Sequence, residues 1–473
     1  METFQAAAPL IAVVAGALAA LLAEAFLRKK DSELPAYLAV GALLVAVALA
    51  VVSWSEEGLA YFGGRLVLDR PALLFMAVLA VLGIFVVLMS LKYAARQDMN
   101  LGQLSGLLLL AVSGAMIMVS SSDWLVVFLG LEVLSVASYA LTGLKRRDRA
   151  SAEAAAKYFL MGSFAGAFFV FGLALVFGTS GSLGLVTALQ PGRGPGGLAP
   201  AAAAGLGLIL TALFFKIAVA PFHMWAPDVY EGAPTPVTAF LTVAPKAAVL
   251  AVLFRVLLPF LTPGRAAAVL GPALGVAAVL TMFAGNLAAL RQRSVKRMLA
   301  YSSIAHSGYL LVAVAAGDGP SLVFYLFAYL FMNVGAFGLL AALSGEGFEH
   351  TSIDDFAGLG RRDPWLAAAL TAFLLSLAGF PPTAGFLAKF YVFGAAVREG
   401  QAPLAIAGVL ASLISVAYYL RVVVVMYMKD GEPETAVERE NPALYLVIFL
   451  CLFGVLQLGL WPGNLLVVIR QAF

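Results

Sequence analysis

Charged side chains and thiols are scarce in this chain. Only 12% of its 473 residues are Asp, Glu, Lys or Arg, whereas soluble domains contain about a quarter. A single cysteine, Cys451, excludes an internal disulfide, a cysteine-based zinc site and an iron–sulfur cluster. No glycine-rich phosphate-binding motif follows a strand-like run. The sequence therefore indicates no redox centre or nucleotide site of its own, and its formal charge of +3 does not favour nucleic acid as a partner.

Long hydrophobic runs are abundant instead, and 62% of the residues are hydrophobic. Runs of about 20 apolar residues match the length needed to cross a bilayer core. No basic residue precedes the first run, so we expect a retained helix and not a cleaved signal peptide. The pattern predicts an all-α integral membrane protein in a lipid bilayer, with fourteen segments at 6–27, 34–53, 67–91, 101–120, 124–144, 154–178, 202–225, 235–260, 266–290, 297–316, 320–343, 365–396, 402–428 and 442–466.

The lysines and arginines between these segments are unequally divided between the two sides. Seventeen of the 29 lie in loops that follow odd-numbered segments. Six lie on the other side: Arg65, Arg70, Arg193, Arg265, Arg398 and Arg470. Because loops rich in Lys and Arg stay in the cytoplasm, we expect the odd-numbered loops on the cytoplasmic side. Both termini are then expected on the outer side.

Four charged residues lie deep inside predicted segments: Glu132, Lys216, Lys246 and Lys389. A charge at the centre of a spanning helix costs about 2.5–3.5 kcal/mol, so four of them cost on the order of 10 kcal/mol. Such residues are retained where they pair, line a wet cavity or carry out the function. A static buried pair of Glu132 and Lys216 is one explanation, but it leaves Lys246 and Lys389 without an obvious carboxylate partner.

Each interior lysine also lies close to a proline. The pairs are Lys216 with Pro221, Lys246 with Pro245, and Lys389 with Pro381 and Pro382. Proline has no N–H, so the carbonyl four residues earlier loses its helical donor. The carbonyls affected are those of Ile217, Leu241, Leu377 and Ala378. Transporters place ion sites at such interrupted helices; ordinary proline kinks are the alternative, but three coincidences of proline and lysine favour function.

A row of buried lysines meets the physical requirement for a proton relay. Burial favours the neutral amine and a nearby carboxylate favours the ammonium, so a lysine between these effects can change protonation near neutral pH. Histidine titrates near pH 6.5 when unperturbed, which makes His306 and His223 further candidates. For His306 the alternative is a neutral imidazole bonded to a hydroxyl such as Ser302 or Tyr301. Lys157 is a weaker candidate, because it lies near a helix end and can reach the surface.

The two long breaks suggest an internal repeat. Segments four to eight and nine to thirteen contain five helices each, so corresponding members face opposite ways, and interrupted segment seven matches interrupted segment twelve. We therefore expect four parts: an N-terminal three-helix part (1–99), a first five-helix repeat (100–260), a second, inverted repeat (261–429) and a C-terminal helix (430–473).

Five stretches carry a specific resemblance: 129–143, 215–248, 294–309, 354–364 and 377–393. The second reads FKIAVAPFHMWAPDVYEGAPTPVTAFLTVAPKAA. They resemble the antiporter-like membrane subunits of bacterial NADH:quinone oxidoreductase (respiratory complex I), a family that includes the Mrp cation/proton antiporters. The resemblance spans roughly residues 60–430. It implies fourteen helices, two inverted five-helix repeats and a half-channel in each.

Carried over position by position, the resemblance implies roles for four residues. Glu132 resembles the family's glutamate of helix 5, and Lys216 resembles its lysine partner in helix 7. Lys246 resembles the connecting lysine of helix 8, and Lys389 the helix 12 residue at the other exit. Lysine at 389, the wording FHMWAPDVYEGAP and a chain that ends soon after segment fourteen resemble the N subunit more than the M or L subunit.

Such a subunit implies proton translocation in a bacterial cytoplasmic (inner) membrane, as part of a translocase. FMN, iron–sulfur clusters, NADH and quinone are expected in partner subunits, and other membrane-arm subunits, including antiporter-like ones, are expected neighbours. Electron transfer would alter the pairing of Glu132 with Lys216, and protons would pass through Lys246 and His306 to Lys389. Two alternatives stay open: an Mrp-type sodium/proton antiporter subunit, which neighbouring genes would identify, and a structural membrane-arm subunit without its own pump.

Overall fold

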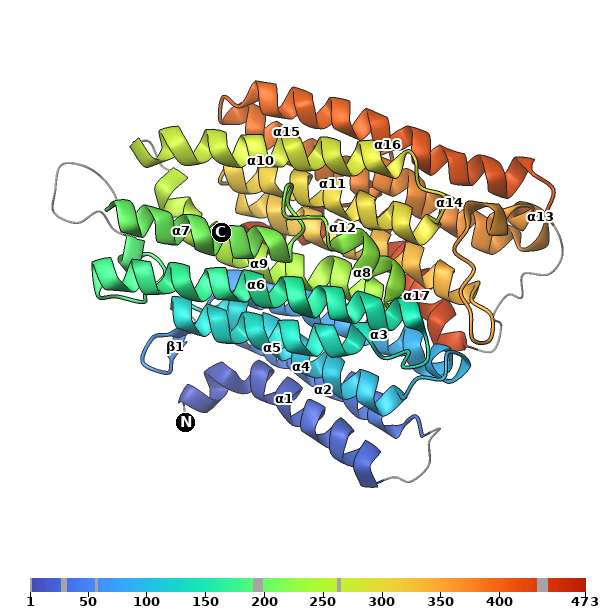
Figure 1. Ribbon diagram of the computed structural model, residues 1–473, viewed down its shortest axis with the longest axis horizontal. Helices are drawn as coiled ribbons and strands as arrows, with labels where there is room; N and C mark the ends of the chain where they lie inside the picture. Colours follow the sequence, from blue (N-terminus) through green and yellow to red (C-terminus); the bar gives the residue numbers. More distant parts are fainter. Residues whose placement is uncertain (1, 27–31, 56–57, 190–198, 262–264, 432–440) are drawn as a thin grey trace.

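The computed structural model describes residues 2–26, 32–55, 58–189, 199–261, 265–431 and 441–473. Most of its helices run side by side along one direction (Figure 1). Five cations that the orientation argument counts, Arg28, Lys29, Lys30, Arg193 and Arg439, lie outside the described residues, as does most of the junction near residue 430.

The α-helices follow the predicted segments closely. Their bounds are α1 Glu2–Phe26, α2 Leu34–Val52, α3 Arg70–Arg96, α4 Leu101–Ser120, α5 Trp124–Thr142, α6 Arg149–Ser180, α7 Pro200–Lys216, α8 Ala226–Gly232, α9 Thr235–Leu261, α10 Arg265–Ala289, α11 Val295–Ala315, α12 Gly319–Ala342, α13 Leu359–Arg362, α14 Pro364–Ala378, α15 Ala384–Arg398, α16 Ala402–Met428, α17 Pro442–Leu460 and α18 Gly463–Arg470. Three short 3-10 helices are η1 Ser53–Ser55, η2 Thr187–Leu189 and η3 Ile353–Phe356. A small antiparallel hairpin, β1 Leu59–Tyr61 with β2 Leu66–Leu68, was not predicted from the sequence.

Twelve helices of the described chain are long and apolar enough to cross a membrane: α1 to α6, α9 to α12, α16 and α17. The other two predicted segments are the interrupted ones. There α7 and α14 are apolar helices of 17 and 15 residues, and α8 and α15 follow after the breaks. The multi-span helical membrane fold is confirmed, whereas the count of fourteen crossings stays a prediction.

Polar side chains fix where many spans begin. Each accepts a hydrogen bond from a backbone N–H of the first helical turn, a group that has no partner within the helix. The capping residues are Asp69 for α3, Asn100 for α4, Asp123 for α5, Asp148 for α6, Ser294 for α11, Asp318 for α12 and Asn441 for α17.

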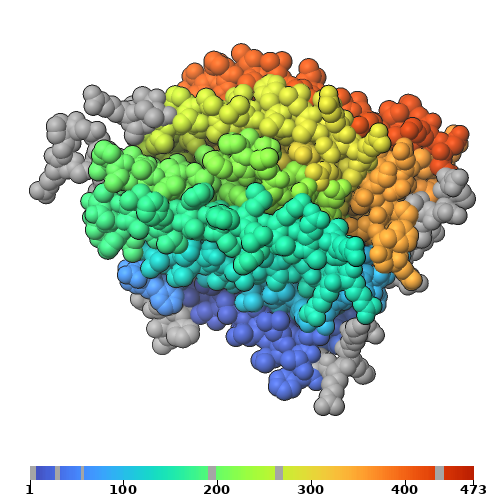
Figure 2. All heavy atoms as spheres, in the orientation of Figure 1, coloured from blue at the N-terminus to red at the C-terminus, as the bar shows by residue number. Residues whose placement is uncertain are grey.

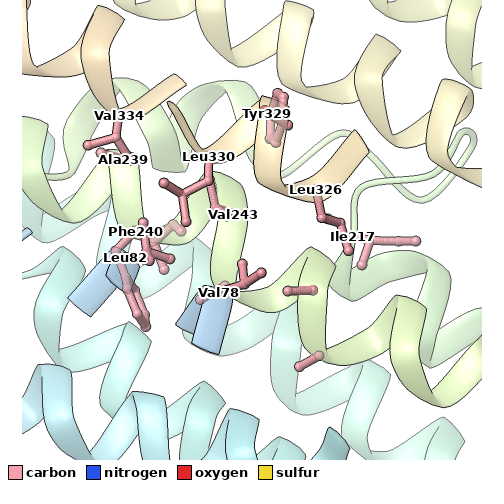
Figure 3. Packing of buried hydrophobic residues seen from close by; sticks show 14 of the residues in the cluster. Val78, Leu82, Ile217, Ala239, Phe240, Val243, Leu326, Tyr329, Leu330 and Val334 are labelled. Carbon is pink, nitrogen blue, oxygen red and sulfur yellow. The ribbon is translucent and has the colours of Figure 1, made fainter. Parts of the chain in front are cut away.

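The centre of the bundle is α9, whose apolar stretch is entirely buried. Figure 3 shows Phe240 and Val243 of α9 packing between Val78 of α3 and Leu330 of α12. By contrast, α1 and α16 lie at opposite edges, coloured dark blue and orange-red in Figures 1 and 2, and less than half of the apolar stretch of each is buried. The edges can therefore contact lipid, while polar groups on α9 are shielded by protein.

Both termini lie at one end of the bundle. At the start of α3, the Arg70 guanidinium donates to the carbonyl of Gln471 at 3.1 Å. At the start of α4, which is the opposite end, Asn100 donates to Glu24 near the end of α1 at 2.5 Å. Because α1 ends there, it begins at the same end as the C-terminus. An even number of membrane-crossing segments places both termini on the same side, so this arrangement agrees with the prediction.

Glycines bring α4 against α5 and α10 against α11. A Cβ on Gly114 would lie 2.5 Å from the backbone nitrogen of Leu134 and 2.7 Å from the carbonyl oxygen of Gly130. A Cβ on Gly285 would lie 2.6 Å from the backbone nitrogen of Ala305. The same close approach occurs in the two helix pairs that the predicted internal repeat would relate to each other.

We expect Gly114→Ala to lower the free energy of unfolding by about 1–3 kcal/mol, because the added methyl meets backbone that cannot rotate away. The matched control is Gly207→Ala in α7, where nothing lies within 4 Å of an added Cβ. That control should be neutral or stabilising by up to about 1 kcal/mol, since alanine favours helix over glycine. Thermal unfolding of the detergent-solubilised chain measures both, and equal melting temperatures would contradict the expectation.

Candidate functional site

Lys216 is the last residue of α7 and is only 3% exposed. Its ammonium donates to the Ser135 hydroxyl of α5 at 2.7 Å. It also lies 5.4 Å from the ring centroid of Tyr139 and 4.9 Å from that of Tyr158. Aromatic faces attract a cation, most strongly where water is excluded. Side chains of α5 and α6 thus form a polar and aromatic cage around the ammonium.

Glu132 lies on α5, three residues before Ser135, and its carboxylate rests against Gly166 of α6. Among the described residues it forms no ion pair within 4.0 Å, with Lys216 or with any other cation. Glu132, Ser135 and Lys216 instead line one cavity of 10 Å³, about the volume that a single water requires. The static Glu132–Lys216 pair considered from the sequence is therefore not formed.

At the break after α7, side chains donate hydrogen bonds to the backbone carbonyls. The Ile217 carbonyl lacks a helical donor, as predicted from Pro221, and accepts a hydrogen bond from the Ser307 hydroxyl of α11 at 2.6 Å. The indole N–H of Trp225 donates to the Phe215 carbonyl at 2.9 Å. Irregular backbone at membrane depth is tolerated where protein surrounds it, and the structure meets that condition here.

Lys246 is buried in α9 and has neutral partners. Its ammonium donates to the Ser303 hydroxyl of α11 and lies 5.2 Å from the ring centroid of Tyr329. The nearby Leu241 carbonyl, freed by Pro245 as predicted, accepts a hydrogen bond from the Tyr230 hydroxyl at 3.2 Å. No carboxylate of the described residues pairs with this lysine.

Lys389, in α15, uses all three of its N–H groups on neutral oxygens. It donates to the carbonyls of Leu377 and Ala378, both at 2.9 Å, and to the Ser412 hydroxyl at 2.8 Å. These carbonyls are the pair that the prolines after α14 were predicted to free. They end α14, where the helix dipole favours a cation. The ammonium thus caps the interrupted helix, and the ring centroid of Tyr309 lies 4.9 Å away.

His306, buried in α11, lies between the last two lysines. Its ring centroid is 4.9 Å from that of Tyr329, which contacts Lys246, and 5.5 Å from that of Tyr309, which contacts Lys389. The imidazole is therefore placed where a group bridging Lys246 and Lys389 would have to be.

The alternative considered for His306 was a neutral imidazole bonded to a hydroxyl such as Ser302 or Tyr301. Its Nδ1 lies 2.8 Å from the hydroxyl of Tyr325 instead. The partner is thus a hydroxyl, as that alternative supposes, but it belongs to Tyr325, while Ser302 pairs with Tyr419.

The Ser307 hydroxyl lies between the break after Lys216 and the serine that holds Lys246. Besides the Ile217 carbonyl, Ser307 reaches the carbonyl of Ser303 at 3.2 Å, and the Ser303 side chain holds Lys246. We call Lys216, Lys246, His306 and Lys389 the lysine row; the groups that hold them are neighbours in the bundle, and no direct contact joins the four residues themselves among those that the structure describes.

Two candidates lie outside this row. Lys157 has a 42% exposed side chain and pairs with Glu153 at 2.6 Å and Asp228 at 2.9 Å. His223 lies in the break after α7, partly buried, and its Nδ1 has no hydrogen-bond partner among the residues that the structure describes. Within the described part of the chain, no hydrogen bond or ion pair joins the side chain of either residue to Lys216, Lys246, His306 or Lys389.

The neutral groups that hold the lysines were missed from the sequence. Serine and tyrosine occur throughout the apolar segments, and no spacing marks the members that matter: Ser135, Ser303, Ser307, Ser412, Tyr309 and Tyr329. Lys296 was also misjudged, since it was counted as a loop cation. It is the second residue of α11, with a side chain that is 0% exposed, and it pairs with Glu349 at 2.7 Å. A lysine directly beside an apolar run was the available signal.

Comparison with known proteins gives a consistent result. The family described as NADH:quinone oxidoreductase/Mrp antiporter, TM, matches residues 121–415. An NADH-quinone oxidoreductase subunit N from Solibacter usitatus is 42% identical over 463 residues, which cover 96% of this chain and 93% of that protein.

Solved structures agree with the sequence comparison. A chain of respiratory complex I from Thermus thermophilus with bound aureothin is 33% identical, with a TM-score of 0.83 over 97% of this chain and 98% of that chain. A chain of the Mrp complex from Dietzia sp. DQ12-45-1b has a TM-score of 0.85 over 99% and 97% of the two chains, but it is 21% identical and bears on the fold alone.

We expect Ser307→Ala to lower the free energy of unfolding by about 1–3 kcal/mol, because it leaves the buried Ile217 carbonyl without a donor. The matched control is Ser90→Ala, whose equally buried hydroxyl donates to the Val86 carbonyl within its own helix. That carbonyl keeps its helical N–H donor, so the control should change stability by less than about 1 kcal/mol. Thermal unfolding in detergent compares the two, and equal destabilisation would refute the role given to Ser307.

Proposed function

Because the chain belongs to the transmembrane family shared by NADH:quinone oxidoreductases and Mrp antiporters, we propose that it is the N-type, proton-translocating subunit in the membrane arm of an NADH:quinone oxidoreductase. The relative named subunit N aligns over nearly the whole of both chains. The similar chain of complex I also matches over nearly its whole length.

The observation that carries the proton-translocating role is the row of buried amines. Lys216, Lys246 and Lys389 are held by hydroxyls, carbonyls and aromatic rings and by no carboxylate among the described residues. A carboxylate in contact stabilises the charged form of its lysine. Neutral acceptors satisfy the ammonium but leave it free to exchange its proton with the next group.

Glu132 is suited to control the first amine. The energy between two charges depends on their distance and on the local dielectric. Since Glu132 and Lys216 face each other across a space of water size, a small shift of either changes the proton affinity of Lys216. A proton released there passes towards Lys246, then past His306 to Lys389. Each proton moved outward works against about 2.3 kcal/mol per 100 mV of membrane potential.

Electron transfer is assigned to partner subunits. FMN, iron–sulfur clusters, NADH and quinone would be bound there, and the other membrane-arm subunits, antiporter-like ones among them, would be the lateral neighbours. The chain would lie in the cytoplasmic membrane of a bacterium, with its odd-numbered loops in the cytoplasm and both termini outside, as the loop charges indicate.

The two repeats would each supply a half-channel. Residues 100–260 contribute Glu132, Lys216 and Lys246, and residues 261–429 contribute His306 and Lys389. The glycine-mediated packing of α4 on α5 and of α10 on α11 supports this division. Residues 1–99 and 430–473 would flank the pair.

An Mrp-type sodium/proton antiporter subunit is the second candidate and has weaker support, since the similar Mrp chain is 21% identical and the similar subunit N is 42% identical. A structural subunit without a pump is the third. Both are separated from the proposal by measuring redox-driven proton transport.

We expect Lys216→Ala to reduce NADH-driven proton pumping by roughly ten-fold or more, because a positioned proton-transfer group contributes about 10²–10⁴-fold. Pumping is measured in inside-out membrane vesicles. Transfer of electrons from NADH to an artificial acceptor checks that the enzyme is assembled.

Arg361→Ala is the matched control, since this arginine forms an exposed ion pair with Asp430. It should pump at the parental rate. Near-normal pumping by an assembled Lys216→Ala enzyme would rule out the relay and favour the structural alternative.

A further inference from the structure

A second group of buried charges lies at the odd-loop end of the bundle, away from the lysine row. Glu349, in the connection after α12, has a side chain that is 11% exposed. One of its oxygens is 3.1 Å from the Lys145 ammonium, and the other is 2.7 Å from that of Lys296. The Tyr93 hydroxyl of α3 donates to it as well. One carboxylate is thus shared by two lysines from different elements.

The same carboxylate binds the first residue of α9. The backbone N–H and the hydroxyl of Thr235 donate to Glu349 at 3.2 and 2.9 Å. Burial opposes ionisation of Glu349, but the charges of Lys296 and Lys145 outweigh it and hold the pKa of this carboxyl well below its ordinary value. Glu349 is therefore an anion at neutral pH, placed at the positive end of the central helix.

Lys145 connects this group to solvent. It lines a cavity of 710 Å³ between the connection of α3 to α4 and that of α5 to α6. The other polar residues of the lining are Gln97, Asp98, Asn100, Gln103, Arg146, Arg147, Asp148 and Arg149. Lys296, on the other side of Glu349, is 0% exposed and also donates to the Ala233 carbonyl at 2.5 Å. The carboxylate thus separates a lysine at the cavity from a lysine in the interior.

Polar residues continue inward from this point along one face of α9. Thr235, Thr238, Thr242 and Lys246 are spaced three or four residues apart, which places them in one stripe. All four are buried. The facing stripe on α11 carries Lys296 and, seven residues later, Ser303, which holds Lys246. A path of about 16 Å therefore runs from Thr235 to Lys246, at 1.5 Å per residue.

We propose that Lys145, Glu349 and Lys296 form the proton-uptake entrance at the odd-loop end, and that the threonine stripe of α9 leads protons from it to Lys246. This inference rests on the proposed function and names its uptake route. None of these residues belongs to the Lys216–Lys389 row, and none was a candidate from the sequence.

In each cycle the entrance takes up one proton from the cavity and delivers one proton to Lys246. Lys296 gives a proton inward, towards neutral Lys246, over hydroxyls and the waters between them. The anionic Glu349 then receives a proton from Lys145 and, after its carboxyl group turns, passes that proton to the neutral Lys296 amine. Lys145 regains its proton from water in the cavity. No electron moves, and the carboxylate returns to its anionic form.

Charged and titratable groups reach this entrance from every neighbouring element. Those closest to Glu349 are Tyr93 of α3, Lys145 of the connection of α5 to α6, and Lys296 on α11, on which the charge of Glu231 of α8 also acts. The charged residues that line the cavity beside Lys145 are Asp98, Arg146, Arg147, Asp148 and Arg149. His350, the next residue of the loop, faces Asp355 at 3.9 Å. Lys145 and Lys296 are the cations in direct contact with Glu349. Replacing Glu349 by a neutral residue should therefore change proton uptake more than replacing any of the groups farther away.

The test is the pH dependence of NADH-driven pumping by inside-out vesicles, in which the odd-loop end faces the medium. In the Glu349→Gln enzyme, proton uptake becomes the rate-limiting step. The pumping rate then depends on the proton concentration of the medium around the vesicles. We expect the rate to fall at least roughly five-fold between about pH 6.5 and about pH 8, more steeply than in the parental enzyme. A merely structural role would lower the rate without changing this slope.

Glu346→Gln is the matched control, because Glu346 is exposed in the same loop, and it should keep the parental profile. If Glu349→Gln prevents assembly, Lys145→Gln decides the question, since glutamine at the edge of the cavity retains an N–H donor for Glu349. A parental pH profile in an assembled Glu349→Gln or Lys145→Gln enzyme overturns the entrance. Normal pumping by Lys216→Ala would instead overturn the proposed function itself.

Discussion

Inside a bilayer, no water is freely available to bond a backbone carbonyl that has lost its helical donor. In this protein the groups that replace the missing donors belong to the candidate site itself. Lys389 caps the two carbonyls at the end of α14, and the Ser307 hydroxyl caps the one at the break after α7. Each interrupted helix is therefore stable only in the company of a side chain from another element. The breaks and the buried polar groups depend on each other, and the bundle must form around both.

The kind of partner decides how a buried amine can behave. Along the central row the ammoniums of Lys216 and Lys246 are held by serine hydroxyls and aromatic faces, which satisfy hydrogen bonds without fixing a charge. At the odd-loop end Lys296 contacts the carboxylate of Glu349 directly, and the two charges stabilise each other. The neutral partners of the row leave the charge of each amine free to change, whereas Glu349 keeps Lys296 charged at rest and also offers it a group that can carry a proton in from the boundary with solvent. The central helix α9 meets both arrangements, since Thr235 begins it beside Glu349 and Lys246 lies in the row.

Apolar and polar side chains occupy different places in the bundle. The edge helices α1 and α16 expose apolar side chains, as lipid contact requires, whereas α9 and its neighbours exclude lipid from the polar groups (Figures 1 and 3). Glycines allow this close packing where α4 meets α5 and where α10 meets α11. A buried charge in such surroundings interacts strongly with its few neighbours because little solvent screens it. Small displacements at Glu132 can therefore alter the proton affinity of Lys216.

Hydrophobic length and proline chemistry are local properties, so the sequence by itself determined the helical membrane fold, the two interrupted segments and the four carbonyls that lose their donors. It also determined that Lys216, Lys246 and Lys389 lie inside the membrane. Only the tertiary structure decided what meets them, because Ser135, Ser303, Ser412 and the tyrosine rings come from helices far away in the chain and carry no local mark. The same holds for Glu349 and Lys296. In the sequence they resemble ordinary charges of a loop and of a helix end. In the folded chain α9, α11 and the loop after α12 lie together, and their packing excludes the water that would otherwise surround these two side chains.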